Sequence, residues 1–443
     1  MPSTTLHFVR KAAVSSMAAL LCGTLLSCGS SQKSMSSSGS STENAGNFTT
    51  TVFIGDSLTA GFQNGSLLDT QQPNGWANLV ATQAKAAITL PLIAPPGAPA
   101  VLQLVSLGPP PVINSASGVT TGRDNPSAQP TDLAVPGHKL NDLINAAPTA
   151  APSTAEDIIT NLVLGFPLGN SNTQLQEAVA LQPTTLFVWI GANDALVADD
   201  TGMPSSMTQV SSFTTLYTQM MQTLTTKTKA NLIVANIPDV TLSPVLTPAA
   251  TVLAEISASS GIPQATLSAM LGITAGDLVN ATGLQEAQKI VASQQQGPID
   301  DAGFLSAAEV LQVQQTIDQY NQVIAQQVAA AGGTLVDIHA LFAKLAAGIT
   351  INNYNASLNF LGGLVGLDGV HPTNTGYALV ANEFIDTMNS SLKTTIPDVD
   401  VSAIASADPL FGPNIKPSGS PNVMIPLNAA QRAGDMIRGW KPR

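Results

Sequence analysis

The chain has 443 residues, of which 44% are hydrophobic and only 10% are charged, against about 25% charged residues in a typical soluble domain. The 28 acidic residues outnumber the 16 basic ones, and the net charge of -12 argues against a nucleic-acid partner, which needs a basic face to neutralise phosphates. The ordinary hydrophobic content excludes disorder throughout the chain. Only one apolar stretch comes near the length that a membrane-spanning helix needs, which excludes a polytopic membrane protein.

Residues 1–27 predict a targeting signal. Arg10 and Lys11 form its positive start, and an apolar run over 12–26 ends just before Cys28. The segment resembles a bacterial lipoprotein signal, in which small residues precede a cysteine that is lipidated and becomes the first residue of the mature chain. The resemblance implies export and a lipid anchor at Cys28 in the bacterial cell envelope, at the outer membrane on its periplasmic or surface face. An ordinary secretory signal that is cut nearby stays open as the alternative.

The remaining chain divides by composition into three parts. Residues 28–47 are rich in serine and predict a flexible tether. Residues 48–394 alternate between strand and helix patterns and predict one large domain. Residues 395–443 contain prolines at short intervals, which predicts an extended or partly disordered segment laid over that domain.

Short continuous apolar runs, most of them ended by glycine or proline, predict buried parallel strands. These runs are residues 50–54, 184–190, 231–237 and 334–338. Helices are predicted between them, one that begins at Trp76 and one that runs from a capping box at Ser306 and Glu309 to Gly332. Strands that alternate with helices predict an α/β domain with a parallel central sheet.

Two stretches do not fit this alternation and predict insertions, at about 88–130 and 241–300. The first is apolar and rich in proline between Ile88 and Ile113. The second is rich in Ala, Ser and Thr, which predicts short helices. Both insertions are expected to cover the cleft of the domain, although the apolar one could equally complete the core.

Two motifs suggest nucleophilic catalysis. Ser57 lies in GDSLTAG directly after the first predicted strand, where open α/β sheets place their ligands. His371 lies in DGVHP, three residues after Asp368. A neutral histidine takes a proton from a hydroxyl, and a carboxylate orients the histidine ring. Taken alone, each motif is also explained by a serine that caps a helix or by an unrelated loop acid.

Two further motifs would stabilise a developing negative charge. Asn193 lies in GAND after the second predicted strand, and its side-chain amide can donate to an oxyanion. Gly137 lies in LAVPG, where the absence of a side chain lets a backbone N–H approach a tetrahedral intermediate closely. The alternatives are ordinary turn chemistry for Asn193 and a tight bend for Gly137.

Together the four blocks GDSLTAG, LAVPG, GAND and DGVHP resemble those of the GDSL, or SGNH, hydrolases, in the same order along the chain. The resemblance spans roughly residues 50–390. It implies a flavodoxin-like three-layer α/β/α sandwich with a parallel central sheet, and ester hydrolysis without a metal or other cofactor. It further implies that Ser57, His371 and Asp368 form the catalytic triad, and that the Ser57 N–H, the Gly137 N–H and the Asn193 side chain form the oxyanion hole.

The implied activity is a serine ester hydrolase, a lipase or carboxylesterase, that cleaves acyl esters of small molecules or lipids through an acyl-enzyme. The apolar insertion would suit acyl chains if it lies beside the cleft. Two alternatives stay open. One is a polysaccharide O-deacetylase of the same fold, and the other is a non-catalytic, lipid-anchored binding protein.

The sequence departs from the family pattern at Asp132, which stands at about the place where the second block often has an Asn. Among the other titratable residues, we expect His138 to line the rim of the pocket and His339 to be structural. Asp56 and Asp194 are expected to shape the turns in which they lie.

Two groups of charged residues outside these motifs are expected to be exposed. The acidic pairs Asp199-Asp200 and Asp300-Asp301 predict solvated loops, because they lack the ligand spacing of a calcium loop. Arg432 and Arg438 are expected to lie in an exposed tail.

Overall fold

The structure, a computed structural model, describes residues 46–108, 110–415 and 423–438. The predicted signal, Cys28 and nearly all of the tether therefore lie outside the described residues. Within those three ranges, no helix has both the length and the apolar character needed to cross a membrane.

The central sheet consists of parallel strands in the order β1-β4-β5-β9. Their bounds are β1 Thr51–Gly55, β4 Thr185–Trp189, β5 Asn231–Ala235 and β9 Thr334–Val336. Every residue of β1 and β4 is buried, as expected for strands covered on both faces. The four predicted strands are confirmed to within about two residues at each end, and the last is shorter because Ile338 already begins a helix.

A short segment at the free edge of β1 completes the sheet. The Phe53 N–H donates to the Thr131 carbonyl at 2.9 Å, and the Leu133 N–H donates back to the Phe53 carbonyl at 2.9 Å. The bridge between Phe53 and Asp132 is parallel. With this segment in second place, the strand order is the 2-1-3-4-5 order of flavodoxin-like folds.

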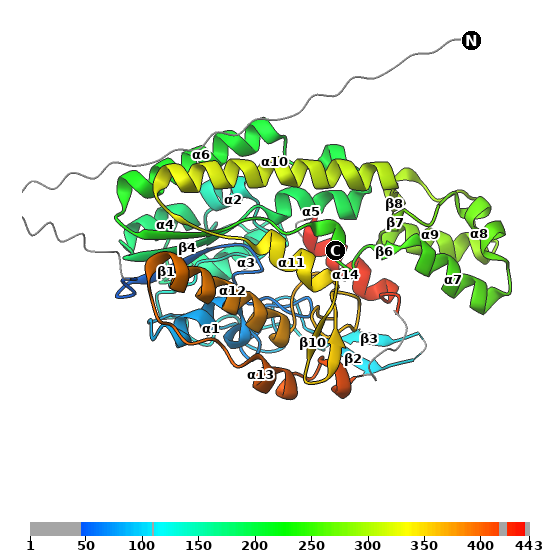
Figure 1. Cartoon of the computed structure of the whole chain (residues 1–443), viewed down its shortest axis with the longest axis horizontal. Helices are drawn as coiled ribbons and strands as arrows, with labels where there is room; N and C mark the ends of the chain where they lie inside the picture. Colours follow the sequence, from blue (N-terminus) through cyan, green and yellow to red (C-terminus); the bar gives the residue numbers. More distant parts are fainter. Residues whose placement is uncertain (1–45, 109, 416–422, 439–443) are drawn as a thin grey trace, which may run out of the picture. The chain divides into compact units, whose positions relative to one another are not determined.

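Helices cover both faces of this sheet (Figure 1). On one face lie α1 Trp76–Gln83, α11 Ile338–Ala346 and α12 Asn374–Leu392. On the other lie α2 Leu140–Asn145, α4 Gln174–Ala180, α6 Val210–Lys227 and α10 Ala307–Ala331. Two more helices of the domain are α3 Ala155–Leu164 and α5 Ala192–Thr201. The predicted three-layer α/β/α arrangement is confirmed.

Stacked aromatic rings fill the layer between the sheet and α1 and α12. The ring centroids of Trp76 and Phe384 lie 3.9 Å apart, and those of Phe53 and Phe187 lie 4.6 Å apart. The predicted capping box begins α10, where the Ser306 N–H donates to Glu309 Oε2 at 2.9 Å. This packing fixes the strand ends from which the candidate site is built.

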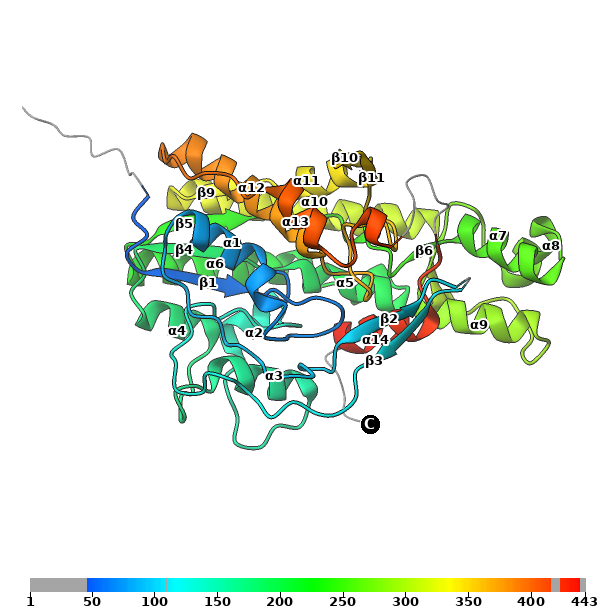
Figure 2. The same ribbon diagram turned by 90° about the horizontal axis from the view of Figure 1, so that it is seen from below.

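The two predicted insertions form a smaller lobe with its own apolar core (Figure 2). The first contains the antiparallel hairpin of β2 Leu102–Ser106 and β3 Val112–Ser115. The second contains α7 Ala249–Ser260, α8 Gln264–Leu271 and α9 Ala281–Val291, as its composition predicted. The short strands β6 Thr247–Pro248, β7 Leu278–Val279 and β8 Phe304–Leu305 pair beside them, and β10 Ile349–Ile351 pairs with β11 Tyr354–Ala356 in a separate hairpin.

The expectation of an extended C-terminal segment is wrong where the structure describes it. The segment contains α13 Val401–Ala407 and α14 Leu427–Ile437. Proline is compatible with the start of a helix, and Pro426 directly precedes α14. Four of the six buried residues of α14 are Ala or Gly, and at Gly434 a Cβ atom would collide with Asp200 of α5. These small residues allow α14 to pack closely against the domain.

Candidate active site

Three of the four sequence blocks follow a strand or the edge segment of the central sheet at its carboxyl end, and the fourth, DGVHP, returns to the same edge from the loop after β11. Ser57 comes two residues after the end of β1, and Asn193 lies in the first turn of α5, just after β4. Gly137 follows the edge segment that pairs with β1. Because parallel strands all end at the same edge of a sheet, these residues lie close together in the fold.

The turn that carries Ser57 is fixed by the residue before it. Asp56 Oδ1 accepts a hydrogen bond from the Leu58 N–H at 3.0 Å, and the Ser57 carbonyl accepts one from the Phe62 N–H at 3.1 Å. Burial raises the pKa of Asp56 to about 7, although the Leu58 N–H acts in the opposite direction. Asp56 thus shapes this turn, as predicted.

His371 and Asp368 form a buried pair. His371 Nδ1 lies 3.1 Å from Asp368 Oδ2, and both residues are inaccessible to solvent. Burial alone would raise the pKa of Asp368, but the His371 charge and hydrogen bonds from the His371 ring, the His371 N–H and the Val370 N–H lower it below its usual value. The other ring nitrogen, His371 Nε2, has no hydrogen-bond partner among the residues that the structure describes. The carboxylate therefore holds one side of the ring and leaves the second nitrogen available.

Residues far away in the sequence hold this pair and its loop in place, which the sequence motifs did not reveal. The Gly65 N–H donates to Asp368 Oδ2 at 2.6 Å, and Asn64 Oδ1 accepts from the Leu367 N–H at 2.8 Å. Both come from the loop that follows Ser57. The Gly369 carbonyl accepts from Ser243 Oγ at 2.5 Å, at the start of the second insertion. Only the tertiary fold brings these segments to the DGVHP loop.

The Asn193 and Gly137 blocks are joined directly. Asn193 Nδ2 donates to the carbonyl of His138 at 3.0 Å, and Asp194 Oδ2 accepts from the Leu140 N–H at 2.9 Å. Gly137 has a φ of +86°, a conformation that glycine adopts without strain. Asp194 thus ties the two blocks together, which agrees with its expected structural role.

The side chain of His138 does not line the rim of the pocket, so that expectation is wrong. It is fully buried, with Nε2 2.9 Å from Thr160 Oγ1 and Nδ1 2.9 Å from Gln174 Nε2. Burial lowers its pKa to about 4, so the ring is neutral near pH 7. His339, predicted as structural, lies at the start of α11 with its N–H bonded to Asn236 Oδ1 at 2.8 Å.

Asp132, the departure from the family pattern, is also completely buried. Its Oδ1 accepts from the Ala134 N–H at 3.1 Å, and its Oδ2 has no hydrogen-bond partner within the described ranges. Burial raises the pKa of Asp132 to about 8, so this side chain is largely protonated near pH 7.

Ser57, Asn193 and His371 line one small pocket of about 40 Å³. Most of its other lining side chains are apolar, and they are Leu58, Ala192, Leu196, Pro238, Val240, Leu242, Phe342, Leu358, Val365 and Val370. A neighbouring pocket of about 290 Å³ shares Leu242, Ser243 and Leu358 with it. The arrangement offers a hydroxyl, an imidazole backed by a carboxylate and an amide donor beside an apolar space.

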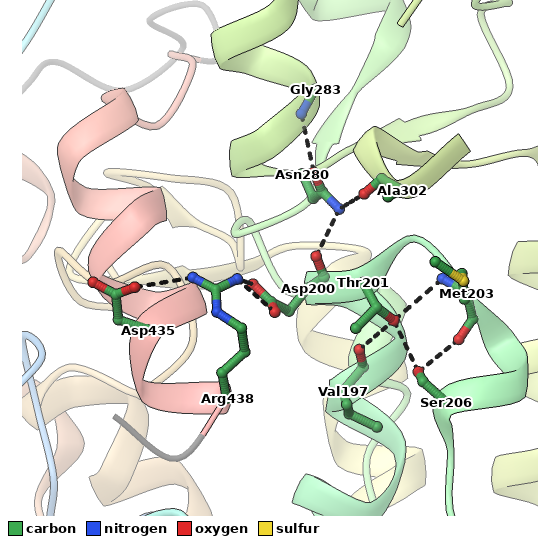
Figure 3. A network of polar contacts seen from close by, with 10 residues as sticks. All are labelled: Val197, Asp200, Thr201, Met203, Ser206, Asn280, Gly283, Ala302, Asp435 and Arg438. Atoms are coloured by element: carbon green, nitrogen blue, oxygen red, sulfur yellow. Dashed lines mark hydrogen bonds and ion pairs between the residues drawn. The ribbon is translucent and has the colours of Figure 1, made fainter. Parts of the chain in front are cut away.

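Asp199 and Asp200 lie at the far end of α5, so the expectation that they lie in solvated loops is wrong. Both are buried on α5, and Asp200 Oδ1 and Oδ2 accept from Arg438 Nη1 at 2.5 and 2.7 Å. Figure 3 shows the Arg438 guanidinium between Asp200 and Asp435, with Asn280 bonded to the Asp200 carbonyl. Arg438 is exposed, as expected, with 48% of its side chain accessible, but it connects α14 to the helix whose first turn carries Asn193 instead of lying in a detached tail.

Arg432 is also anchored rather than free. Its Nη2 donates to the Ala100 carbonyl at 2.7 Å and joins α14 to the first insertion. Asp300 and Asp301, by contrast, are exposed as predicted.

Comparison with known proteins places this site in context. The family GDSL-like Lipase/Acylhydrolase matches residues 51–384. Similar solved structures include an acetylxylan esterase from Geobacillus stearothermophilus, at 13% identity and a TM-score of 0.37, covering 78% of this chain and 96% of that one. Another is an α/β hydrolase from the metagenome of Lake Arreo, Spain, at 12% identity and a TM-score of 0.34, covering 77% and 95%. A comparison with curated protein sequences finds no match.

Proposed function

The chain belongs to the GDSL-like lipase/acylhydrolase family and is a carboxylic ester hydrolase, and on that premise we propose that it cleaves acyl esters through an acyl-enzyme on Ser57. The observation that carries this proposal is that His371, paired with the buried Asp368, lines the same pocket as Ser57. Membership of a hydrolase family sets aside the alternative of a non-catalytic binding protein.

In the proposed mechanism, His371 Nε2 takes the proton of the Ser57 hydroxyl as its oxygen attacks the ester carbonyl. Asp368, whose pKa is lowered, stays charged and stabilises the imidazolium that forms. The oxyanion is bound by the N–H groups of Ser57 and Gly137 and by the side chain of Asn193. His371 then protonates the leaving alcohol, and water repeats the two steps and releases the acid.

Two features of the site support this oxyanion hole. Asn193 Nδ2 uses one of its two N–H groups to bind the His138 carbonyl, so the other remains for the substrate oxygen. Gly191, at the turn before Asn193, has a φ of +115°, and a Cβ atom there would approach Ile237 Cδ1 to 2.8 Å. Glycine is therefore needed to aim the first turn of α5 at the pocket.

The apolar lining of the pocket supports a substrate with a short apolar acyl group. The volume of about 40 Å³ accommodates little more than a small acyl chain, and the neighbouring pocket offers room for the alcohol or for a longer chain. The small volume also favours a second candidate, a deacetylase of polysaccharides, in which the acyl group is acetate.

A series of nitrophenyl esters of increasing acyl-chain length tests both the proposed nucleophile and the proposed acyl group. We expect Ser57→Ala to lose nearly all activity, while the control Ser212→Ala, at an exposed position of α6, retains it. Hydrolysis of propionate and butyrate esters supports the carboxylesterase, and activity confined to acetate supports the deacetylase. Full activity of Ser57→Ala would refute the proposed nucleophile.

We further propose that the protein is exported and lipidated at Cys28, which anchors it in the bacterial cell envelope. The support is the sequence alone, where the apolar run ends directly before Cys28. Metabolic labelling with a fatty-acid analogue should mark the wild-type chain and not Cys28→Ser. Labelling that persists in Cys28→Ser would refute the anchor.

A further inference from the structure

Residues 86–122 contain no charged side chain. At the chain's average of 10% charged residues, a stretch of this length would hold about four. The first charge that follows, Arg123, is turned inward and donates to the Ala128 carbonyl at 2.9 Å. A surface segment without charges is unusual in a soluble protein, because charged residues normally keep exposed surfaces solvated.

This segment exposes apolar side chains at the tip of the β2–β3 hairpin. One face of the hairpin is buried in the lobe core through Leu102 and Ile113. Beyond this core, Val105 is 60% exposed, and Leu107 and Val112 are each 45% exposed. Val105 lies at the irregularity in the strand pairing between Leu104 and Ser106, where the regular alternation of inward and outward side chains is interrupted.

An open groove of about 660 Å³ continues the apolar segment. Pro99, Val119 and Ile158 lie along it, and Val119 is 87% exposed. The charged side chains of the groove, Arg432 and Asp435, come from α14, and the segment itself adds the uncharged polar side chains of Ser115 and Thr120. A groove with apolar walls and a few polar groups can bind an acyl chain that carries a polar end.

We propose that the charge-free segment 86–122, from the hairpin tip to the rim of this groove, docks onto a lipid bilayer. A protein partner would be recognised through Arg, Trp or Tyr side chains, and the segment contains none of these. The net charge of -12 would repel the protein from an anionic surface, whereas a face without charge can approach zwitterionic lipid. The apolar side chains at the tip then enter the bilayer, and the groove accepts an acyl chain.

This inference does not depend on the catalytic proposal, and its test measures insertion rather than activity. Single cysteines are introduced as Val105→Cys and Val119→Cys in the full chain, in which Cys22 and Cys28 are replaced by serine. Each variant carries an environment-sensitive fluorophore. The matched control is Leu311→Cys on α10, where the native side chain is 58% exposed but lies outside the charge-free segment.

Phosphatidylcholine vesicles should shift the emission of the labels at Val105 and Val119 to shorter wavelength, and lipids spin-labelled in their acyl chains should quench both. The label at Leu311 should show neither effect, even if the N-terminal segment itself binds vesicles. An unchanged emission at Val105 or Val119, or an equal change at Leu311, would overturn the proposal. So would a shift that grows with protein concentration in the absence of vesicles, because a second copy of the chain would then cover this face.

Discussion

Replacing Asp132 by asparagine is expected to stabilise the protein, and to do so more at high pH than at low pH. The side chain is completely buried, and burial raises its pKa from 3.8 to about 8. The native state therefore holds a proton that the unfolded state has already lost, and folding becomes less favourable as the pH rises between these two values. Asparagine has no proton to lose, and its Oδ1 can still accept the hydrogen bond from the Ala134 N–H.

The size of the effect follows from the shift itself. At about 1.36 kcal/mol per pKa unit, the rise from 3.8 to about 8 gives a ceiling of about 6 kcal/mol above the folded-state pKa. Urea unfolding of wild type and Asp132→Asn at about pH 5 and about pH 9 measures this difference. The control is Asp318→Asn, at an exposed position of α10, which should change stability little at either pH. An Asp132→Asn variant that is equally stabilised at both pH values, or is less stable than wild type at high pH, would refute the reasoning.

Four further substitutions test the site and the contacts that support it. Asn193→Ala should lower kcat by about 10²- to 10³-fold in ester hydrolysis with little change in KM, because it removes one oxyanion donor; a change confined to KM would contradict this role. Asp368→Asn should lower kcat by about 10⁴-fold, since His371 loses the carboxylate that orients it, and near-normal kinetics would argue against the pair. Arg438→Gln should destabilise the protein by about 1–2 kcal/mol in urea unfolding and Asp200→Asn by less, because only the first leaves a buried charge without its partner; the reverse order would contradict the account.

The strands of the sheet could be predicted because each is a short apolar run buried on both faces. The α10 helix could be predicted because its capping box and its apolar spacing agree. The edge segment that pairs with β1 has no such pattern, since it follows Pro130 and precedes Pro136 and forms only a few backbone bonds. Its role as a strand depends on β1 being beside it, which no local signal encodes.

Proline misled the prediction at the other end of the chain. A proline at the start of a helix is compatible with it, and Pro426 lies directly before α14. The burial of Asp200 depends on α14, which the sequence patterns do not predict. Asp200 is buried because Arg438 of α14 covers it.

The positions of the site residues could be predicted better than the hydrogen bonds that hold them in place. Ser57, Asn193 and His371 meet because their blocks follow parallel strands or return to the same edge. The bond from the Gly65 N–H to Asp368 joins residues 303 positions apart, and no spacing in the sequence reveals it. His138 was expected at the rim because it follows Gly137, but its ring turns inward to Thr160.

The central claim is that Ser57 is the nucleophile of an ester hydrolase. The most direct measurement is reaction with a fluorophosphonate, followed by mapping of the modified peptide by mass spectrometry. The account predicts one adduct, on Ser57, which is absent from Ser57→Ala and strongly slowed in Asp368→Asn. An adduct on another serine, or an unmodified Ser57 in a preparation that hydrolyses esters, would contradict it.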